Sequence, residues 1–172
     1  MSIYLPSRVC RSEFVPVRGL SYHVRIWDPV IPPSGTAVAP TLVMVHGWMD
    51  VSASFQFLVD RLGPQWRIIA PDWRGYGLTE WPKADCYWFP DYLGDLDALL
   101  ERYSPDAPVR LVGHSMGGNV ATIYAGVRPE RVAKLVNLEG MGMPRQDPAK
   151  APERYGQWLG ELRAGARMRD YA

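Results

Sequence analysis

Short β-branched runs alternate with amphipathic stretches along this chain, and this alternation restricts the fold more than any other feature. The segment 41–45 (TLVMV) is a continuous apolar run bounded by turn residues, as is typical of a strand buried on both faces. Strands that alternate with helices are joined by right-handed crossovers and form a parallel sheet with helices on both faces. The sequence therefore predicts an α/β fold with a mostly parallel sheet.

The other expected elements follow from the same periodicities. Two N-terminal strands, at 14–17 and 21–27, are predicted to form a hairpin at Gly19. Further strands are expected at 66–70, 109–112 and 132–138, and helices at 54–62, 90–103, 116–127 and 152–169. The pattern changes after Gly140, so we expect one domain over residues 1–143 and the start of a second over 144–172.

Charge and composition exclude several classes of function. Nineteen Lys and Arg face 18 Asp and Glu, for a net charge of +1, which argues against a nucleic-acid partner. No apolar run approaches the ~18 residues of a membrane span. The N-terminal stretch is interrupted by prolines and charges, so no secretory signal is expected there. Two cysteines are too few for a disulfide scaffold, which favours a cytoplasmic location. The oligomeric state is not predicted.

The strongest chemical signal is the segment Gly113-His-Ser-Met-Gly117, which follows an expected strand and opens an expected helix. This is the G-x-S-x-G nucleophile elbow in its required context. The tight turn holds the Ser115 hydroxyl clear of the backbone and needs Gly113 and Gly117 to be free of side chains. The Met116 N–H then points toward a bound acyl oxygen. The alternative is a phosphate-binding turn, but neither G-x-x-x-x-G-K-[ST] nor G-x-G-x-x-G occurs.

Two further motifs accompany the elbow. His46-Gly47-Trp48 ends the apolar strand at 41–45, and residues 71–79 read PDWRGYGLT. From about residue 14 to 143, the chain resembles the α/β-hydrolase superfamily, whose D-x-R-G-x-G-x-S loop has a Thr here at its last position. The resemblance implies that the Trp48 N–H joins the Met116 N–H in an oxyanion hole. It also implies that Asp72 and Arg74 are structural residues.

The resemblance implies the chain order Ser, then acid, then His, yet no histidine follows Ser115. His46 and His114 do not have a spacing that suits a general base, and His23 is expected to be a surface or packing residue. The family places its histidine after the eighth strand, whereas only six strands are expected here. We therefore interpret the chain as the N-terminal portion of a longer hydrolase, truncated after the sixth strand, with a helical cap beginning at 144. It is expected to be inactive alone.

Glu139 is the candidate acid, because it ends the expected strand 132–138. The segment resembles the corresponding one in haloalkane dehalogenases, which use a Glu there, while most family members carry the acid after the seventh strand. A solvated or cap-binding carboxylate is the alternative for Glu139. The dehalogenases and the epoxide hydrolases have an Asp nucleophile, so Ser115 argues against both activities.

These features favour a serine hydrolase that cleaves an ester or similar small acyl substrate through an acyl-enzyme. No cofactor is implied, and three scattered histidines predict no metal site. An apolar or aromatic substrate group is suggested by loop aromatics, namely Trp48, Trp73, Trp81, Tyr87 and Trp88. Two alternatives stay open: a non-catalytic member that binds a ligand or partner, and a hydrolase of C–C bonds or lactones.

Overall fold

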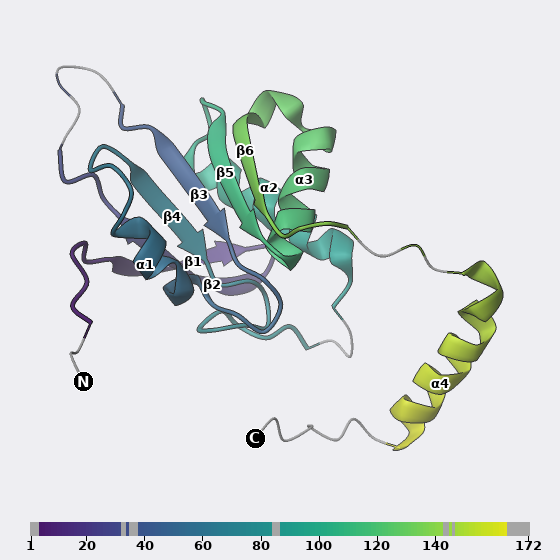
Figure 1. Ribbon diagram of the computed structural model, residues 1–172. Coiled ribbons are helices and arrows are strands. Elements are labelled where there is room, and N and C mark those ends of the chain that lie inside the picture. Colours follow the sequence, from purple (N-terminus) through teal and green to yellow (C-terminus); the bar gives the residue numbers. More distant parts are fainter. Residues whose placement is uncertain are drawn as a thin grey trace. The chain divides into compact units, whose positions relative to one another are not determined.

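Six strands form one mixed sheet in the computed structural model, which describes residues 4–31, 34, 38–83, 87–142, 145 and 147–164, without the Leu162 side chain. The strand order is β1-β2-β4-β3-β5-β6 (Figure 1). The bounds are β1 Arg11–Val17, β2 Leu20–Trp27, β3 Thr41–Val45, β4 Arg67–Pro71, β5 Val109–His114 and β6 Val132–Leu138. The strands β4, β3, β5 and β6 run parallel, while β1 and β2 pair antiparallel at one edge. The predicted α/β class is confirmed.

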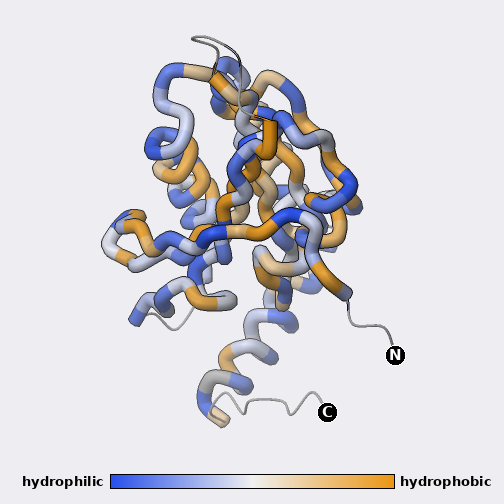
Figure 2. The backbone as a smooth tube through the Cα atoms, turned by 90° about the vertical axis from the view of Figure 1, so that its left-hand side faces the viewer, coloured by the Kyte–Doolittle hydropathy of each residue, from blue (hydrophilic) through white to orange (hydrophobic). Residues whose placement is uncertain are grey.

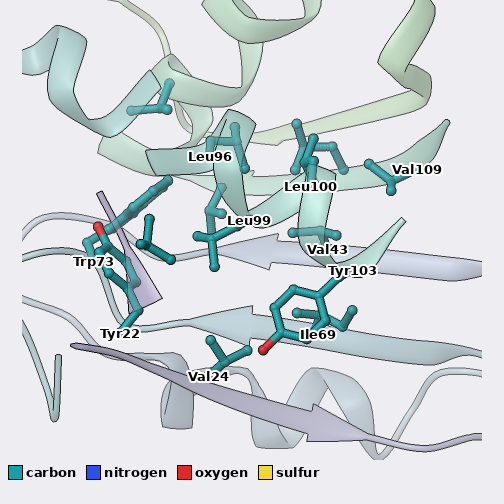
Figure 3. Packing of buried hydrophobic residues seen from close by; sticks show 14 of the residues in the cluster. Tyr22, Val24, Val43, Ile69, Trp73, Leu96, Leu99, Leu100, Tyr103 and Val109 are labelled. Carbon is teal, nitrogen blue, oxygen red and sulfur yellow. The ribbon is translucent and has the colours of Figure 1, made fainter. Parts of the chain in front are cut away.

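Two longer helices pack on one face of this sheet. They are α2 (Phe89–Tyr103) and α3 (Met116–Val127), and both lie where the apolar periodicity predicts them. Alternate strand residues, such as Val43, Ile69 and Leu111, meet them in the larger core cluster. Figure 3 shows the α2 leucines lying over the strands that carry Val43 and Ile69.

The opposite face is covered by a much shorter element than predicted. Instead of one helix over 54–62, the structure has a 3₁₀ turn, η1 (Ser52–Phe55), and a single turn, α1 (Gln56–Val59). Beyond Val59 the backbone tightens, because the N–H groups of Arg61 and Leu62 bond to carbonyls three residues back. The smaller core cluster on this face still includes Phe55 and Val59, the inward residues of the predicted stripe.

The chain divides into two units, residues 1–141 and 142–172. The second contains the short helix η3 (Pro148–Lys150) and α4 (Ala151–Ala164), and the predicted continuation to 169 lies outside the described residues. The α4 side chains of Tyr155, Trp158 and Leu159 are apolar and exposed. Figure 2 shows hydrophobic and hydrophilic residues alternating along the helices. Within the described residues, no helix has the length and apolarity to cross a bilayer.

Candidate active site

Ser115 occupies the sharp turn between β5 and α3, with φ 50° and ψ −115°. A positive φ is strained for any residue with a side chain, and such outliers cluster at functional sites. The turn is possible because two glycines flank it. A Cβ on Gly113 would lie 2.4 Å from the Gly117 carbonyl oxygen, and a Cβ on Gly117 would lie 2.3 Å from the Val45 carbonyl oxygen. Both positions therefore require glycine.

The loop after β3 passes directly against this turn. A Cβ on Gly47 would lie 3.1 Å from the Ser115 Cβ atom, a tight contact that glycine avoids at this close approach. Trp48 follows with its side chain 63% exposed, and Met49 adopts a left-handed φ of 56°. The loop thus runs beside Ser115. The assignment of the Trp48 and Met116 N–H groups as donors stays a prediction.

His46 fixes the start of this loop. Its Nδ1 atom lies 2.7 Å from the Gly47 carbonyl oxygen, which can only accept, so Nδ1 carries the hydrogen. Its Nε2 atom then accepts the Trp73 backbone N–H at 2.9 Å, and the Trp73 indole donates to the His46 carbonyl at 2.9 Å. Burial lowers the pKa of His46 and keeps the ring neutral. Both ring nitrogens are occupied, so His46 does not act as the base.

The two remaining histidines face other groups. The His114 Nδ1 atom lies 3.8 Å from an Asp50 carboxylate oxygen. His23 is completely buried in β2, with ring contacts to Asp72 and Ser12. In the part of the chain that the structure describes, no histidine hydrogen-bonds to the Ser115 hydroxyl.

Glu139 follows β6 beside the elbow, because the Ser115 N–H donates to the Leu138 carbonyl at 2.8 Å. It is exposed and has a left-handed φ of 61°. The Asn137 amide holds this turn, since it accepts the Gly140 N–H at 2.6 Å and donates to the Gly140 carbonyl at 2.7 Å. A non-glycine residue with such a φ marks a site where the surroundings outweigh the strain. The structure thus places Glu139 directly after the residue whose carbonyl accepts the Ser115 N–H.

Asp72 bonds several segments together. Its carboxylate accepts the backbone N–H groups of Ser52 at 2.7 Å and Leu78 at 3.0 Å, and it contacts His23. Burial alone would raise the pKa of Asp72, but these hydrogen bonds outweigh it and hold the pKa below its usual value. The Thr79 hydroxyl donates to the Asp72 carbonyl at 2.6 Å. The loop 71–79 is therefore held by hydrogen bonds within itself and by contacts to two neighbouring segments, at His23 and Ser52.

Arg74, in the same loop, makes a two-pronged ion pair with Asp95 of α2, at 2.5 and 2.6 Å. The Tyr22 hydroxyl also donates to Asp95. The sequence reasoning did not find Asp95, although a signal exists: this acid lies between Tyr92 and Leu99 on the apolar face of α2. A charged residue on a buried helix face indicates a buried partner.

The prediction that Trp73 is one of the aromatic residues around the pocket is wrong. Trp73 is fully buried and packs edge-on against Tyr92 in the core, where its indole N–H donates to the His46 carbonyl. The other expected aromatics, Trp48, Trp81, Tyr87 and Trp88, are exposed. Among the described residues, no group of three or more His, Cys, Asp or Glu side chains is arranged to hold a metal.

The known proteins that this chain resembles in sequence and in structure include hydrolases. A model of the alpha/beta hydrolase fold matches residues 40–168. A serine hydrolase-like protein from Danio rerio is 33% identical over 142 residues, which cover 78% of this chain and 40% of that protein. The crystal structure of epoxide hydrolase VrEH1 from Vigna radiata has a TM-score of 0.67 at 26% identity, covering 88% of this chain and 47% of the other. A thioesterase domain from the curacin biosynthetic pathway has a TM-score of 0.72 at 24% identity, covering 90% and 52%, and supports the fold alone. The chain spans about half the length of these proteins.

Proposed function

The chain belongs to the alpha/beta hydrolase family, and from this premise we propose that Ser115 is the nucleophile of a serine hydrolase that cleaves an ester or a similar small acyl substrate. The observation that carries the proposal is the backbone of Ser115, with its left-handed φ at the junction of β5 and α3. A hydroxyl on such a turn stands free at the positive end of a helix, where a developing negative charge is stabilised.

The chemistry of serine favours acyl substrates over epoxides, although the family includes epoxide hydrolases. When a serine oxygen attacks an acyl carbon, the product is an ester that water can cleave, so the enzyme is regenerated. If the same oxygen opened an epoxide, the product would be an ether, which an activated water does not hydrolyse. Ser115 therefore supports acyl transfer to water, and the epoxide hydrolases are relatives in fold and sequence only.

We infer that the general base is a histidine outside these 172 residues. The three histidines of the chain are His23, His46 and His114, and none follows Ser115 in the sequence. His46 has both ring nitrogens bonded, and His114 faces Asp50. The Danio rerio relative is more than twice as long as the matched region, which leaves room for such a residue.

The proposal is tested by covalent labelling of Ser115. In a protein that supplies the histidine, a fluorophosphonate probe is expected to react at Ser115, and Ser115→Ala is expected to remove more than nine-tenths of the label from the peptide containing residues 113–118. Gly113 and Gly117 stay in place in this variant, so the turn is preserved. An unlabelled Ser115 in the folded wild-type protein would support a non-catalytic member of the family instead.

We propose that Glu139 is the acid that orients the missing histidine. Glu139→Gln preserves the shape of the side chain and is expected to lower kcat by about 10⁴-fold, as the loss of a triad carboxylate does elsewhere. KM is expected to change little, because the acid does not touch the substrate. Glu130→Gln, an exposed acid in η2 (Pro129–Arg131), is the matched control. An unchanged kcat for Glu139→Gln would place the acid at another position.

A further inference from the structure

A second group of side chains, away from the elbow, has the arrangement that activates a serine. The Ser12 Oγ atom lies 3.0 Å from His23 Nε2, and His23 Nδ1 lies 2.7 Å from Asp72 Oδ2. We propose that Ser12, His23 and Asp72 form a second reactive-serine site, at which Ser12 is acylated by activated acyl donors. The proposal is independent of the role of Ser115.

Hydrogen-bonding capacity orients the ring of His23. An ionised carboxylate only accepts, and hydrogen bonds hold the pKa of Asp72 below its usual value, so His23 Nδ1 donates to it. In the neutral ring that the proposal uses, His23 Nε2 then carries no hydrogen and accepts from the Ser12 hydroxyl. This is the tautomer that a general base needs, with the carboxylate orienting the ring and stabilising the imidazolium that forms.

The fold builds the group from two strands, β1 and β2, and from the residue that follows a third, β4. Phe14 of β1 is the direct partner of His23 in β2, and Ser12 lies two residues before Phe14, on the same face of the hairpin. Asp72 follows β4, the other neighbour of β2, and its N–H donates to the His23 carbonyl at 3.0 Å. Each side chain is thus placed by regular pairing, which keeps the distances fixed.

The nucleophile of this group is exposed and its two partners are buried, as a reactive serine site requires. Asp72 is 2% exposed and His23 is completely buried, whereas Ser12 is exposed on the edge strand. The nucleophile therefore meets solvent while its base is shielded from it. Arg25 is the direct partner of Ser12 across the hairpin, and its positive charge favours negative charge developing near Ser12.

The reaction is an ordinary acyl transfer. The Ser12 oxygen attacks the acyl carbon and forms the new C–O bond, while its proton moves to His23 Nε2. The bond to the leaving group then breaks, and the leaving group takes its electron pair and the proton from His23. With a fluorophosphonate, a P–O bond forms, the P–F bond breaks, and fluoride leaves with the proton passing to solvent.

We expect this reaction to be stoichiometric. Ser12 lies within a strand, whereas Ser115 lies at the start of a helix, where N–H groups are free to hold an oxyanion. Without that stabilisation, the acyl group on Ser12 is removed slowly. The site therefore accumulates an acyl or phosphonyl group that can be mapped by mass spectrometry.

The test uses the Ser115→Ala protein and a fluorophosphonate probe, with peptide mapping over time. Ser12 is expected to react at least about 100-fold faster than Ser21, an exposed serine in the same hairpin, because general-base assistance is worth ~10²–10⁴-fold. Adding Ser12→Ala should remove the label. Adding His23→Gln should slow it to the Ser21 rate, since the side-chain amide cannot take a proton.

Circular dichroism decides whether the His23→Gln variant is folded. If it is not, the rate of labelling of the folded Ser115→Ala protein is compared in H₂O and D₂O, and a slower reaction in D₂O supports proton transfer in the rate-limiting step. Labelling of Ser12 at the rate of Ser21, or an equal rate in folded His23→Gln, overturns the proposal. So does an equal rate in the two solvents when only that comparison is possible.

Discussion

Replacing Asp95 by alanine is expected to lower the free energy of unfolding by about 3–5 kcal/mol, as the loss of one partner of a buried ion pair does. Asp95 is completely buried, and both its oxygens bond to the Arg74 guanidinium, at 2.5 and 2.6 Å. Without it, the Tyr22 hydroxyl loses its acceptor, and the Arg74 charge, only 8% exposed, is left with the more distant Asp91 carboxylate at 3.5 Å. Urea unfolding, followed by circular dichroism, measures the change.

Glu101 offers a matched control on the same helix. It also pairs with an arginine, with 3.7 Å between Arg131 Nη2 and its carboxylate, but this carboxylate is at the surface. Glu101→Ala is therefore expected to cost about 0.5 kcal/mol. A loss below about 1 kcal/mol for Asp95→Ala would mean that water replaces the carboxylate and that Arg74 is less enclosed than its contacts indicate.

The sequence predicts the regular elements well because each has its own periodicity. Thr41–Val45, Met116–Val127 and Val132–Leu138 agree with the structure to the residue. The helix expected at 54–62 is wrong in its length, because the apolar spacing at Phe55 and Val59 persists through a 3₁₀ turn and a single α-turn. Periodicity reports which side is buried, and it does not report how the backbone hydrogen bonds are made.

Some parts of the candidate site can also be predicted from the local sequence, and others cannot. The elbow and the His46-Gly47 loop are recognisable because their geometry requires glycine at fixed spacing, and the steric contacts at Gly113, Gly117 and Gly47 give the reason. The Arg74–Asp95 pair and the contacts of His23 depend on which strands become neighbours. Nothing in the local sequence around Ser12 indicates that it meets His23.

The second large effect concerns turnover by the 172 residues themselves. Their kcat for a short-chain nitrophenyl ester is expected to be about 10⁶-fold below that of a serine hydrolase with a complete triad, which is the loss seen when a triad histidine is removed. Ser115 keeps a hydroxyl of high pKa, because His46 is committed to the Gly47 carbonyl and the Trp73 N–H. The only sources of rate acceleration that we expect to remain are substrate binding and the turn that contains Ser115.

A steady-state assay with purified protein measures this rate, and two variants identify its source. Ser115→Ala removes the contribution of the elbow, and Ser12→Ala removes any burst of product from acylation at the second site. We expect a small burst that depends on Ser12 and a slow steady rate that depends weakly on Ser115. Turnover in the ordinary range of ~1–10³ s⁻¹ that is lost in Ser115→Ala would contradict the prediction. It would require His114 to leave Asp50 and reach its sequence neighbour, since His46 and His23 are fully buried and already bonded.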